Sequence, residues 1–130
     1  ILTIGHPGNF AVEAAEKLKE DGADVAVYDL RFVKPLDEVM LHEVFGKFDK
    51  VITVEDGCLM GGMGSAVVEF MTDHGYTASV KRLGIPDLFF EHGSQKELYA
   101  EAGFGVDDIE ATARKMLADQ LKKLTKYAAG

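Results

Sequence analysis

The sequence has 130 residues, of which 47% are hydrophobic and only 3 are proline, enough for one compact domain with a buried core. Acidic side chains outnumber basic ones by 22 to 14, and the net charge of −8 argues against a nucleic-acid partner. The single cysteine, Cys58, excludes an internal disulfide or multi-thiolate metal site and fits a reducing compartment. Because no apolar run approaches the roughly 18 to 20 residues of a membrane span, we expect a cytoplasmic domain without a membrane partner.

The first half of the chain alternates apolar runs with amphipathic segments. Residues 1–4 predict a strand, and the Gly-His-Pro-Gly that follows favours a turn. We expect Asn9 to cap a helix that ends near Gly22. Residues 25–32 have the β-branched and aromatic content of a second strand. Asp37 is expected to cap a second helix, whose predicted inner face consists of Met40, Leu41, Val44, Phe45 and Phe48.

The second half repeats this alternation. Residues 51–54 predict a third strand, and the helix after it is expected to stop near Gly75. Residues 80–85 predict a fourth strand. Residues 94 and 97 have the serine and glutamate of a capping box, and the acidic pair at 107 and 110 repeats that spacing before the last helix. The predicted inner face of the last helix consists of Ile109, Ala113, Met116, Leu117, Leu121 and Leu124, with Lys122, Lys123 and Lys126 near its carboxyl end.

Strands that alternate with helices of about 10 to 14 residues predict an α/β fold with a largely parallel sheet covered on both faces. The chain begins with Ile1 inside a strand-like run, so we expect residues 1–130 to form a single domain of a longer protein. Ligands of such sheets usually meet the loops at the carboxyl ends of the strands. Three loops are therefore candidates, at residues 5–9, 32–37 and 55–65.

A glycine-rich loop is the best local candidate for binding an anion. It contains Gly61, Gly62, Gly64 and Ser65 immediately before a predicted helix. Glycines let backbone amides approach an anion, and a helix N-terminus adds a favourable partial charge. The loop lacks the third glycine of a dinucleotide fingerprint and the Gly-Lys-Ser/Thr of a phosphate loop. A structural turn that lets strand and helix pack closely is the alternative interpretation.

Other candidate residues each have a structural alternative. Glu55 and Asp56 could couple their titrations for acid/base work, or be solvated or hydrogen-bonded to another domain. Arg31 could bind a phosphate or pair with a carboxylate of the chain. His92 could contact a neighbouring chain or act in catalysis. Cys58 has no identifiable base and is expected to be a buried, unreactive thiol.

The four histidines do not have the spacing of a zinc pair, so no metal site is predicted. Two of them, His42 and His74, are expected on helix surfaces.

Five short motifs occur in one order along the chain. They are Arg-Phe-Val-Lys-Pro-Leu-Asp at 31–37, Val-Ile-Thr-Val-Glu-Asp at 51–56, Gly-Gly-Met-Gly-Ser-Ala-Val at 61–67, Leu-Gly-Ile-Pro-Asp at 83–87 and Glu-His-Gly at 91–93. This series closely resembles the C-terminal domain of the 1-deoxy-D-xylulose-5-phosphate synthase family, within the transketolase superfamily. The resemblance covers about residues 1–117. It implies a three-layer α/β/α fold around a mixed, mostly parallel sheet of about five strands.

The resemblance also implies a function for the parent protein. Members of the family are homodimeric, thiamine-diphosphate-dependent transferases that condense pyruvate with glyceraldehyde 3-phosphate and release carbon dioxide. Their product supplies isoprenoid, thiamine and pyridoxal synthesis. The cofactor and its magnesium lie between the N-terminal and central domains, and the Gly-Asp-Gly motif of that site is absent from this sequence. We therefore expect this piece to bind no cofactor or metal, to hold no catalytic residue, and to support assembly with those domains.

Two alternatives remain beside this interpretation. The chain could be a free-standing anion- or nucleotide-binding α/β module that uses the 61–65 loop and Arg31. It could also be the C-terminal domain of another transketolase-like enzyme. A small hydrolase built on Cys58 and a histidine ranks behind both.

Overall fold

In a computed structural model that describes residues 1–129, apart from the side chains of Leu121 and Lys123, four strands form one parallel sheet. The strands are β1 (Leu2–Thr3), β2 (Tyr28–Asp29), β3 (Lys50–Cys58) and β4 (Ser79–Ile85), in the spatial order β2-β1-β3-β4. The helices are α1 (Pro7–Glu20), α2 (Glu38–Lys47), α3 (Met63–Asp73), α4 (Gln95–Ala102) and α5 (Val106–Ala128).

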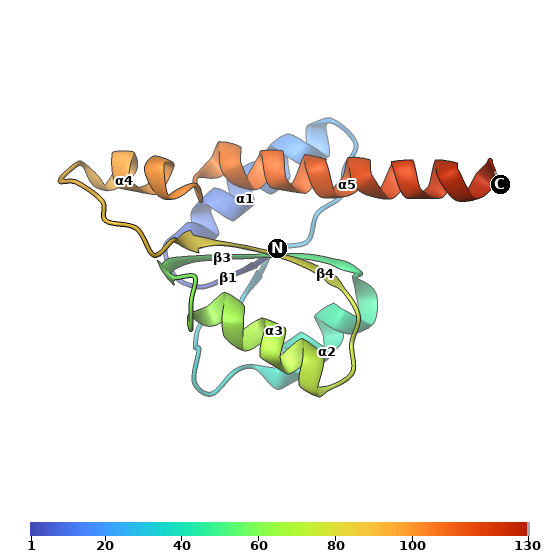
Figure 1. Ribbon diagram of the computed structural model, residues 1–130, viewed down its shortest axis with the longest axis horizontal. Coiled ribbons are helices and arrows are strands. Elements are labelled where there is room, and N and C mark those ends of the chain that lie inside the picture. The colour runs from blue at the N-terminus through green and yellow to red at the C-terminus, as the bar shows by residue number, and fades with distance from the viewer. Residues whose placement is uncertain (130) are drawn as a thin grey trace.

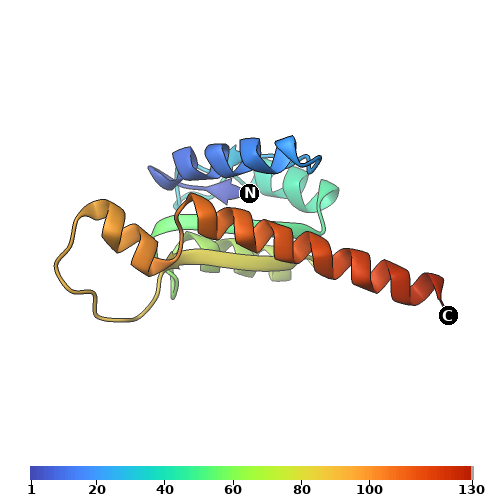
Figure 2. The same cartoon turned by 90° about the horizontal axis from the view of Figure 1, so that it is seen from above.

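The helices form a layer on each side of the sheet. Helices α1, α4 and α5 lie on one side, and α2 and α3 lie on the other (Figures 1 and 2). This arrangement confirms the predicted three-layer α/β/α fold. The sheet of the described residues differs from the expectation of about five mixed strands, because it has four strands and every pairing in it is parallel.

The two strands at one side of the sheet are shorter than predicted. The predicted strand at 25–32 contributes only Tyr28–Asp29 to the sheet. It ends where Arg31 adopts a positive φ of 58°, with its amide donating to Asp29 Oδ1 over 3.0 Å. A positive φ turns the chain away from an extended path, so the ladder ends at Leu30, whose amide still donates to the Thr3 carbonyl at 2.9 Å.

Strand β3 is longer than predicted. It runs from Lys50 to Cys58 and therefore includes Glu55 and the three residues after it, which were expected to lie in a loop. Its pairing with β4 shifts register between Val54 and Cys58. Such a bulge turns side chains locally, and it lies where Glu55 turns toward the start of α3.

Two of the predicted helix caps are wrong. The first helix starts at Pro7 rather than after Asn9, because the fixed φ of proline suits the first helical position. At α5 the amide of Gly105 donates to Asp108 Oδ2, so the cap lies two residues before the predicted acidic pair. The capping box of Ser94 and Glu97 is confirmed in full at α4.

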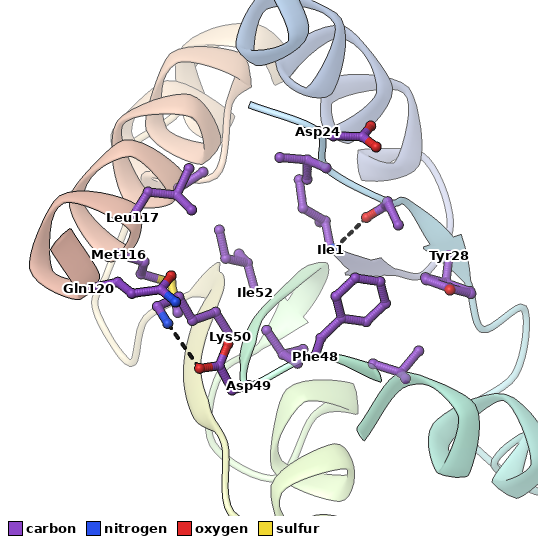
Figure 3. Close-up of a pocket in the computed structure, with 15 residues that line it drawn as sticks. Ile1, Asp24, Tyr28, Phe48, Asp49, Lys50, Ile52, Met116, Leu117 and Gln120 are labelled. Carbon is purple, nitrogen blue, oxygen red and sulfur yellow. Dashed lines mark hydrogen bonds and ion pairs between the residues drawn. The ribbon is translucent and has the colours of Figure 1, made fainter. Parts of the chain in front are cut away.

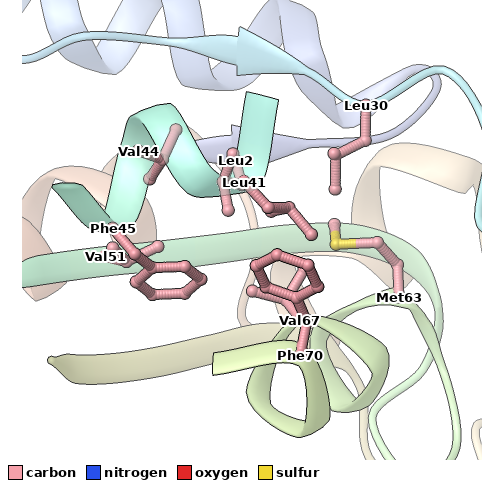
Figure 4. Packing of buried hydrophobic residues seen from close by; sticks show 9 residues of the cluster. All are labelled: Leu2, Leu30, Leu41, Val44, Phe45, Val51, Met63, Val67 and Phe70. Atoms are coloured by element: carbon pink, nitrogen blue, oxygen red, sulfur yellow. The ribbon is translucent and has the colours of Figure 1, made fainter. Parts of the chain in front are cut away.

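Two apolar clusters hold the layers together. One lies between the sheet and helices α2 and α3, where Leu2, Val51 and Val67 meet (Figure 4). The other lies between the sheet and helices α1 and α5, around Ile52, Phe104 and Ile109. Most of the predicted inner face of α2 is buried, but Phe48 follows the last turn of that helix and is partly exposed.

The amino-terminal part of α5 packs as predicted and its carboxyl-terminal part does not. Ile109, Ala113 and Met116 are buried, while Leu117 and Leu124 are exposed. The helix continues past the end of the sheet, as Figures 1 and 2 show. The predicted inward contacts of Leu121 and the predicted role of Lys123 concern side chains outside the described residues.

Candidate functional site

The loops that follow the four parallel strands gather at one edge of the sheet, which we call the carboxyl edge. Parallel strands end at the same side, so the loops after β2, β3 and β4 meet there although they are far apart in sequence. Figure 1 shows the chain turning at this edge before α2, α3 and α4. The predicted candidate residues of the 55–65 loop, together with Arg31 and His92, lie in these segments.

The carboxylate of Glu55 occupies the amino end of α3. Its side chain is buried, with 3% of its surface exposed. Oε2 accepts a hydrogen bond from the amide of Met63 at 2.8 Å, and Oε1 accepts one from the amide of Gly64 at 2.9 Å. A helix N-terminus favours a negative charge and needs acceptors for its free amides. Glu55 supplies both the negative charge and the acceptor atoms from within the chain. It does so at the glycine-rich loop, which the sequence indicated as the candidate for binding an anion.

Glycines enclose this carboxylate tightly. A β-carbon on Gly62 would overlap the carbonyl oxygen of Cys58 and the carboxylate of Glu55. One on Gly57 would lie 2.9 Å from Glu55 Oε2, and one on Gly84 of β4 would lie 3.0 Å from Glu55 Cγ. The glycine-rich sequence therefore has a packing reason, namely that strand, loop and helix approach one another around a buried side chain.

A second hydrogen-bonded group fixes the outer part of the loop. Ser65 Oγ donates to the carbonyl oxygen of Leu59 at 2.9 Å and accepts from the amide of Gly61 at 3.1 Å. Arg82, on the neighbouring strand β4, donates through Nη1 to the same carbonyl at 2.7 Å and to Ser65 Oγ at 2.8 Å. The guanidinium thus links β4 to the loop, and Gly61 turns the chain with a φ of +75°.

The other predicted site residues lie outside the hydrogen-bonded group of Ser65 and Arg82. Arg31 lines a separate hollow beside β2 and the residues that follow it. His92 is exposed in the segment between β4 and α4, and Asp56 is exposed at the edge of the sheet. Cys58 is exposed rather than buried as expected, because it ends β3 at the rim of the sheet.

Apolar side chains are exposed in all three loops of the carboxyl edge. Phe89 is fully exposed, and Phe32, Met60 and Leu88 are between 65% and 73% exposed. An open hollow joins the loop before α2 to the glycine loop, with Val33 and Val39 on one side and Gly61 on the other. Large apolar groups exposed in this way are typical of a surface that another protein part covers.

Sequence reasoning missed two polar residues of the site. Arg82 lies in a predicted strand, and nothing local in the sequence indicates that it reaches the glycine loop. Thr53 is fully buried, and its Oγ1 has no hydrogen-bond partner among the residues that the structure describes. A β-carbon on Gly64 would meet this oxygen at 2.5 Å, so the start of α3 covers it closely.

Two histidines that were treated separately lie together. His42 and His74 are exposed as predicted, and their ring centroids are 4.8 Å apart. Nδ1 of His42 lies 2.8 Å from the hydroxyl of Tyr76, and Nδ1 of His74 lies 2.9 Å from the carbonyl oxygen of Phe70. Within residues 1–129, no three His, Cys, Asp or Glu side chains gather closely enough to hold a metal ion.

Among the helices of the described part, none has both the length and the apolar character needed to cross a membrane.

Comparison with known proteins agrees with the arrangement described above. The family model for the transketolase C-terminal domain matches residues 1–109. A 1-deoxy-D-xylulose-5-phosphate synthase of Cytophaga hutchinsonii is 57% identical over 122 residues, which cover 94% of this chain and 19% of that protein. The synthase of Parabacteroides distasonis is 49% identical over 95% of this chain and 18% of that protein. The chain thus spans about one fifth of the length of these relatives.

A solved structure shows the same fold. It is described as a split-gene transketolase in the form of an inactive β4 tetramer, and it superposes with a TM-score of 0.80 at 31% identity. The match covers 90% of this chain and 37% of the other.

Proposed function

Because the chain belongs to the transketolase C-terminal domain family, we propose that it is the assembly and support domain of a 1-deoxy-D-xylulose-5-phosphate synthase. The parent enzyme of this proposal is a cytoplasmic homodimer that uses thiamine diphosphate and magnesium. It joins pyruvate and glyceraldehyde 3-phosphate in a pathway to isoprenoid, thiamine and pyridoxal precursors. The chain alone is catalytically inert, and its partners are the N-terminal and central domains. Relatives at 57% and 49% identity support this choice over another transketolase-like enzyme.

The exposed apolar carboxyl edge is the observation that carries the proposal. Phe89, Leu88 and Met60 extend into solvent from loops that leave the sheet. Leaving such side chains in water costs free energy, and covering them with another domain recovers it. A support domain needs a surface of this kind, whereas a free-standing enzyme domain needs a concave site with reactive groups.

The polar part of the edge fits neither a diphosphate group nor its magnesium. Glu55 already accepts from the two amides at the start of α3, and a phosphate there would meet its negative charge at close range. In thiamine-diphosphate enzymes the cofactor would supply the reaction's chemistry, and the protein would bind and orient it. We therefore assign cofactor binding to the other domains of the parent enzyme.

A chimera tests this function with the whole enzyme. The 122 matched residues of the Cytophaga hutchinsonii synthase would be replaced by the corresponding part of this chain, and the pyruvate-dependent formation of deoxyxylulose phosphate would be measured. We expect an active enzyme. A Leu88→Asp/Phe89→Asp chimera should lose most of the activity and assemble poorly. A Val12→Asp chimera, which changes an exposed valine on the outer side of α1, serves as the control.

An inactive but well-folded chimera would contradict the proposal, as would full activity of the Leu88→Asp/Phe89→Asp variant. Calorimetric titration of the 130-residue chain with thiamine diphosphate and magnesium checks the second part of the proposal. No heat of binding is expected, and micromolar affinity would overturn the assignment of the cofactor to the other domains.

A further inference from the structure

The open hollow between the loop before α2 and the glycine loop extends along α3. Its volume is about 900 Å³. Residues 33–39 line one side of it, and α3 lines the other side from Ser65 through Glu69 to Asp73. The eight steps from Ser65 to Asp73 span about 12 Å of helix. The hollow therefore follows α3 from the carboxyl edge to the end of the helix, which gives it the length of a chain segment rather than of a single ion.

Carboxylates dominate the charged lining of this hollow. They come from the start of α2 and from α3, namely Asp37, Glu38, Glu69 and Asp73. Among the described residues that line the hollow, Lys34 is the only lysine or arginine. Four carboxylates against one ammonium give the lining a charge of −3 when His74 is neutral. A surface of this charge attracts cationic groups and repels anions.

Three of these carboxylates have no cation of their own chain beside them. Asp37 is used as the cap of α2. In the part of the chain that the structure describes, no ion pair involves Glu38, Glu69 or Asp73. Between α1 and α5, by contrast, one lysine and one arginine of the chain hold three carboxylates. The acidic groups of the hollow are therefore free to meet a cation from another part of the protein.

The side of the hollow opposite α3 also has apolar groups. Val39, in the first turn of α2, is 82% exposed, and Val33 is 38% exposed. A small cation would satisfy the carboxylates but leave both valines in water. A purely apolar segment would cover the valines but bury carboxylates without partners, which costs free energy. Only a partner with both apolar and cationic side chains fits the two kinds of lining.

The hollow is continuous with the surface that the proposed function assigns to assembly. Gly61 and Gly62 line its mouth at the carboxyl edge, and the exposed Met60 immediately precedes them. A domain that covers Met60 therefore also reaches the opening of the hollow.

From these observations we infer that the hollow between α2 and α3 receives a chain segment of another domain of the parent enzyme, apolar against Val33 and Val39 and with lysine or arginine against Glu69 and Asp73. The inference rests on the proposed function, because it takes the partner from the same assembly. Lysine and arginine suit this place, since their methylene stems cover apolar surface while their charged ends reach a carboxylate. The charges fix the register of the segment and disfavour acidic segments, and the valines contribute apolar burial.

Charge reversal in the chimera with the Cytophaga hutchinsonii synthase tests the inference. The variant is Glu69→Lys/Asp73→Lys, which changes the last residue of α3 and the residue four positions before it. The matched control, Glu16→Lys/Glu20→Lys, makes the same change at the same two positions of α1, in the opposite layer. Lysine near the carboxyl end of a helix is favourable, so neither variant should unfold the domain. Circular dichroism of each chimera checks this.

The pyruvate-dependent formation of deoxyxylulose phosphate is the measurement. We expect the reversal to lower it at least about tenfold, because like charges brought together repel strongly. The control should stay within about twofold of the unmodified chimera. The neutral variant Glu69→Gln/Asp73→Asn should lose less than the reversal, since it removes an attraction without adding a repulsion. Added salt should restore part of the activity of the reversed variant by screening that repulsion.

A further variant tests the apolar side of the hollow. Val39→Asp puts a charge where the segment is apolar, and we expect a several-fold loss of activity. An acidic residue in the first turn of α2 favours the helix itself, so the loss would not come from unfolding. The Val12→Asp chimera is again the control.

The outcomes separate this inference from the proposed function. An active chimera that tolerates the reversal as well as the control would overturn the inference alone, as would equal losses in the reversed and neutral variants. An inactive unmodified chimera would overturn both. Size-exclusion chromatography of the 130-residue chain checks the choice of partner. Self-association that Glu69→Lys/Asp73→Lys abolishes would mean that a second copy of this domain fills the hollow, which would also overturn the inference.

Discussion

The two edges of the sheet satisfy their polar groups in different ways. At the carboxyl edge, the free amides of α3 and the outer loop find acceptors within the chain, in Glu55 and Ser65. At the opposite edge of the sheet, which we call the amino edge, the Ile1 nitrogen donates to the carbonyl oxygen of Ala26, and apolar side chains line a hollow beside it (Figure 3). In parallel sheets the carboxyl edge is the usual place for a ligand. Here the start of α3 at that edge is occupied by the internal carboxylate of Glu55.

The largest effect is expected from adding a methyl group to the closed edge. Gly62→Ala would place a β-carbon against the Cys58 carbonyl and the Glu55 carboxylate, so the loop or the carboxylate must move. We expect a loss of about 3 to 5 kcal/mol in the free energy of unfolding, measured by urea denaturation. Gly46→Ala is the matched control, because a β-carbon there meets nothing within 4 Å. That control should be neutral or slightly stabilising, and equal losses in both variants would contradict the packing argument.

Removing the carboxylate of Glu55 should lower the free energy of unfolding somewhat less than Gly62→Ala does. Glu55→Ala leaves the buried amides of Met63 and Gly64 without partners, and we expect a loss of about 3 kcal/mol in unfolding free energy. Glu55→Gln retains one acceptor oxygen and should lose about 2 kcal/mol. Protection of the same two amides in hydrogen exchange should fall with stability. A variant as stable as the original chain would show that the carboxylate is not needed at the helix start.

At the amino edge, the buried amine predicts a dependence on pH. The pKa of the Ile1 ammonium is about 6 when folded and near 8.0 when unfolded, so the unfolded state binds more protons between these values. Stability should therefore rise from pH 6 to pH 8, by about 3 kcal/mol at most. A chain extended by Ser-Gly-Gly ahead of Ile1 has no amine at this site and is the control. The difference between the two pH profiles is the measurement, and parallel profiles would contradict the prediction.

The smallest expected effect is a gain in the free energy of unfolding rather than a loss. Thr53→Val replaces a buried hydroxyl that lacks a partner among the described residues with a methyl group of similar size. We expect a gain of about 1 kcal/mol in unfolding free energy, because no unpaired polar atom remains buried. Thermal unfolding measures the gain. A destabilised variant would mean that the Thr53 hydroxyl contributes a hydrogen bond that the structure does not record.

Local sequence patterns predicted the structural features that depend on residues close together in the sequence. The apolar run at 51–54 and the serine and glutamate at 94 and 97 each contain their own signal, and both predictions are confirmed. The capping of α5 depends on Gly105 and Asp108, a pair that the acidic residues two positions later obscured. The predicted second strand is confirmed but is shorter than 25–32, because the turn at Arg31 that ends it is stabilised by the Asp29 side chain and not by a proline or glycine.

For the candidate site, the sequence predicted which residues lie in the loop but not which side chains they contact. Gly61, Gly62, Gly64 and Ser65 were identified as a loop that approaches something negative, and the structure supplies that charge from Glu55. The pairing could not be predicted, because Glu55 reaches the helix start only where β3 bulges at its end. Arg82 belongs to the next strand, and its contact with Ser65 depends on the order of strands in the sheet.

The sequence by itself determined the α/β alternation, the two buried faces and the family, because periodicity, caps and ordered motifs are properties of short segments. Only the tertiary structure decided what fills each end of the sheet. Whether a helix start is open or occupied depends on a side chain from another element, and whether a strand position is filled depends on the backbones at its two sides. Both are contacts between distant segments, and at the carboxyl edge they enclosed the side chain of Glu55 at the start of α3.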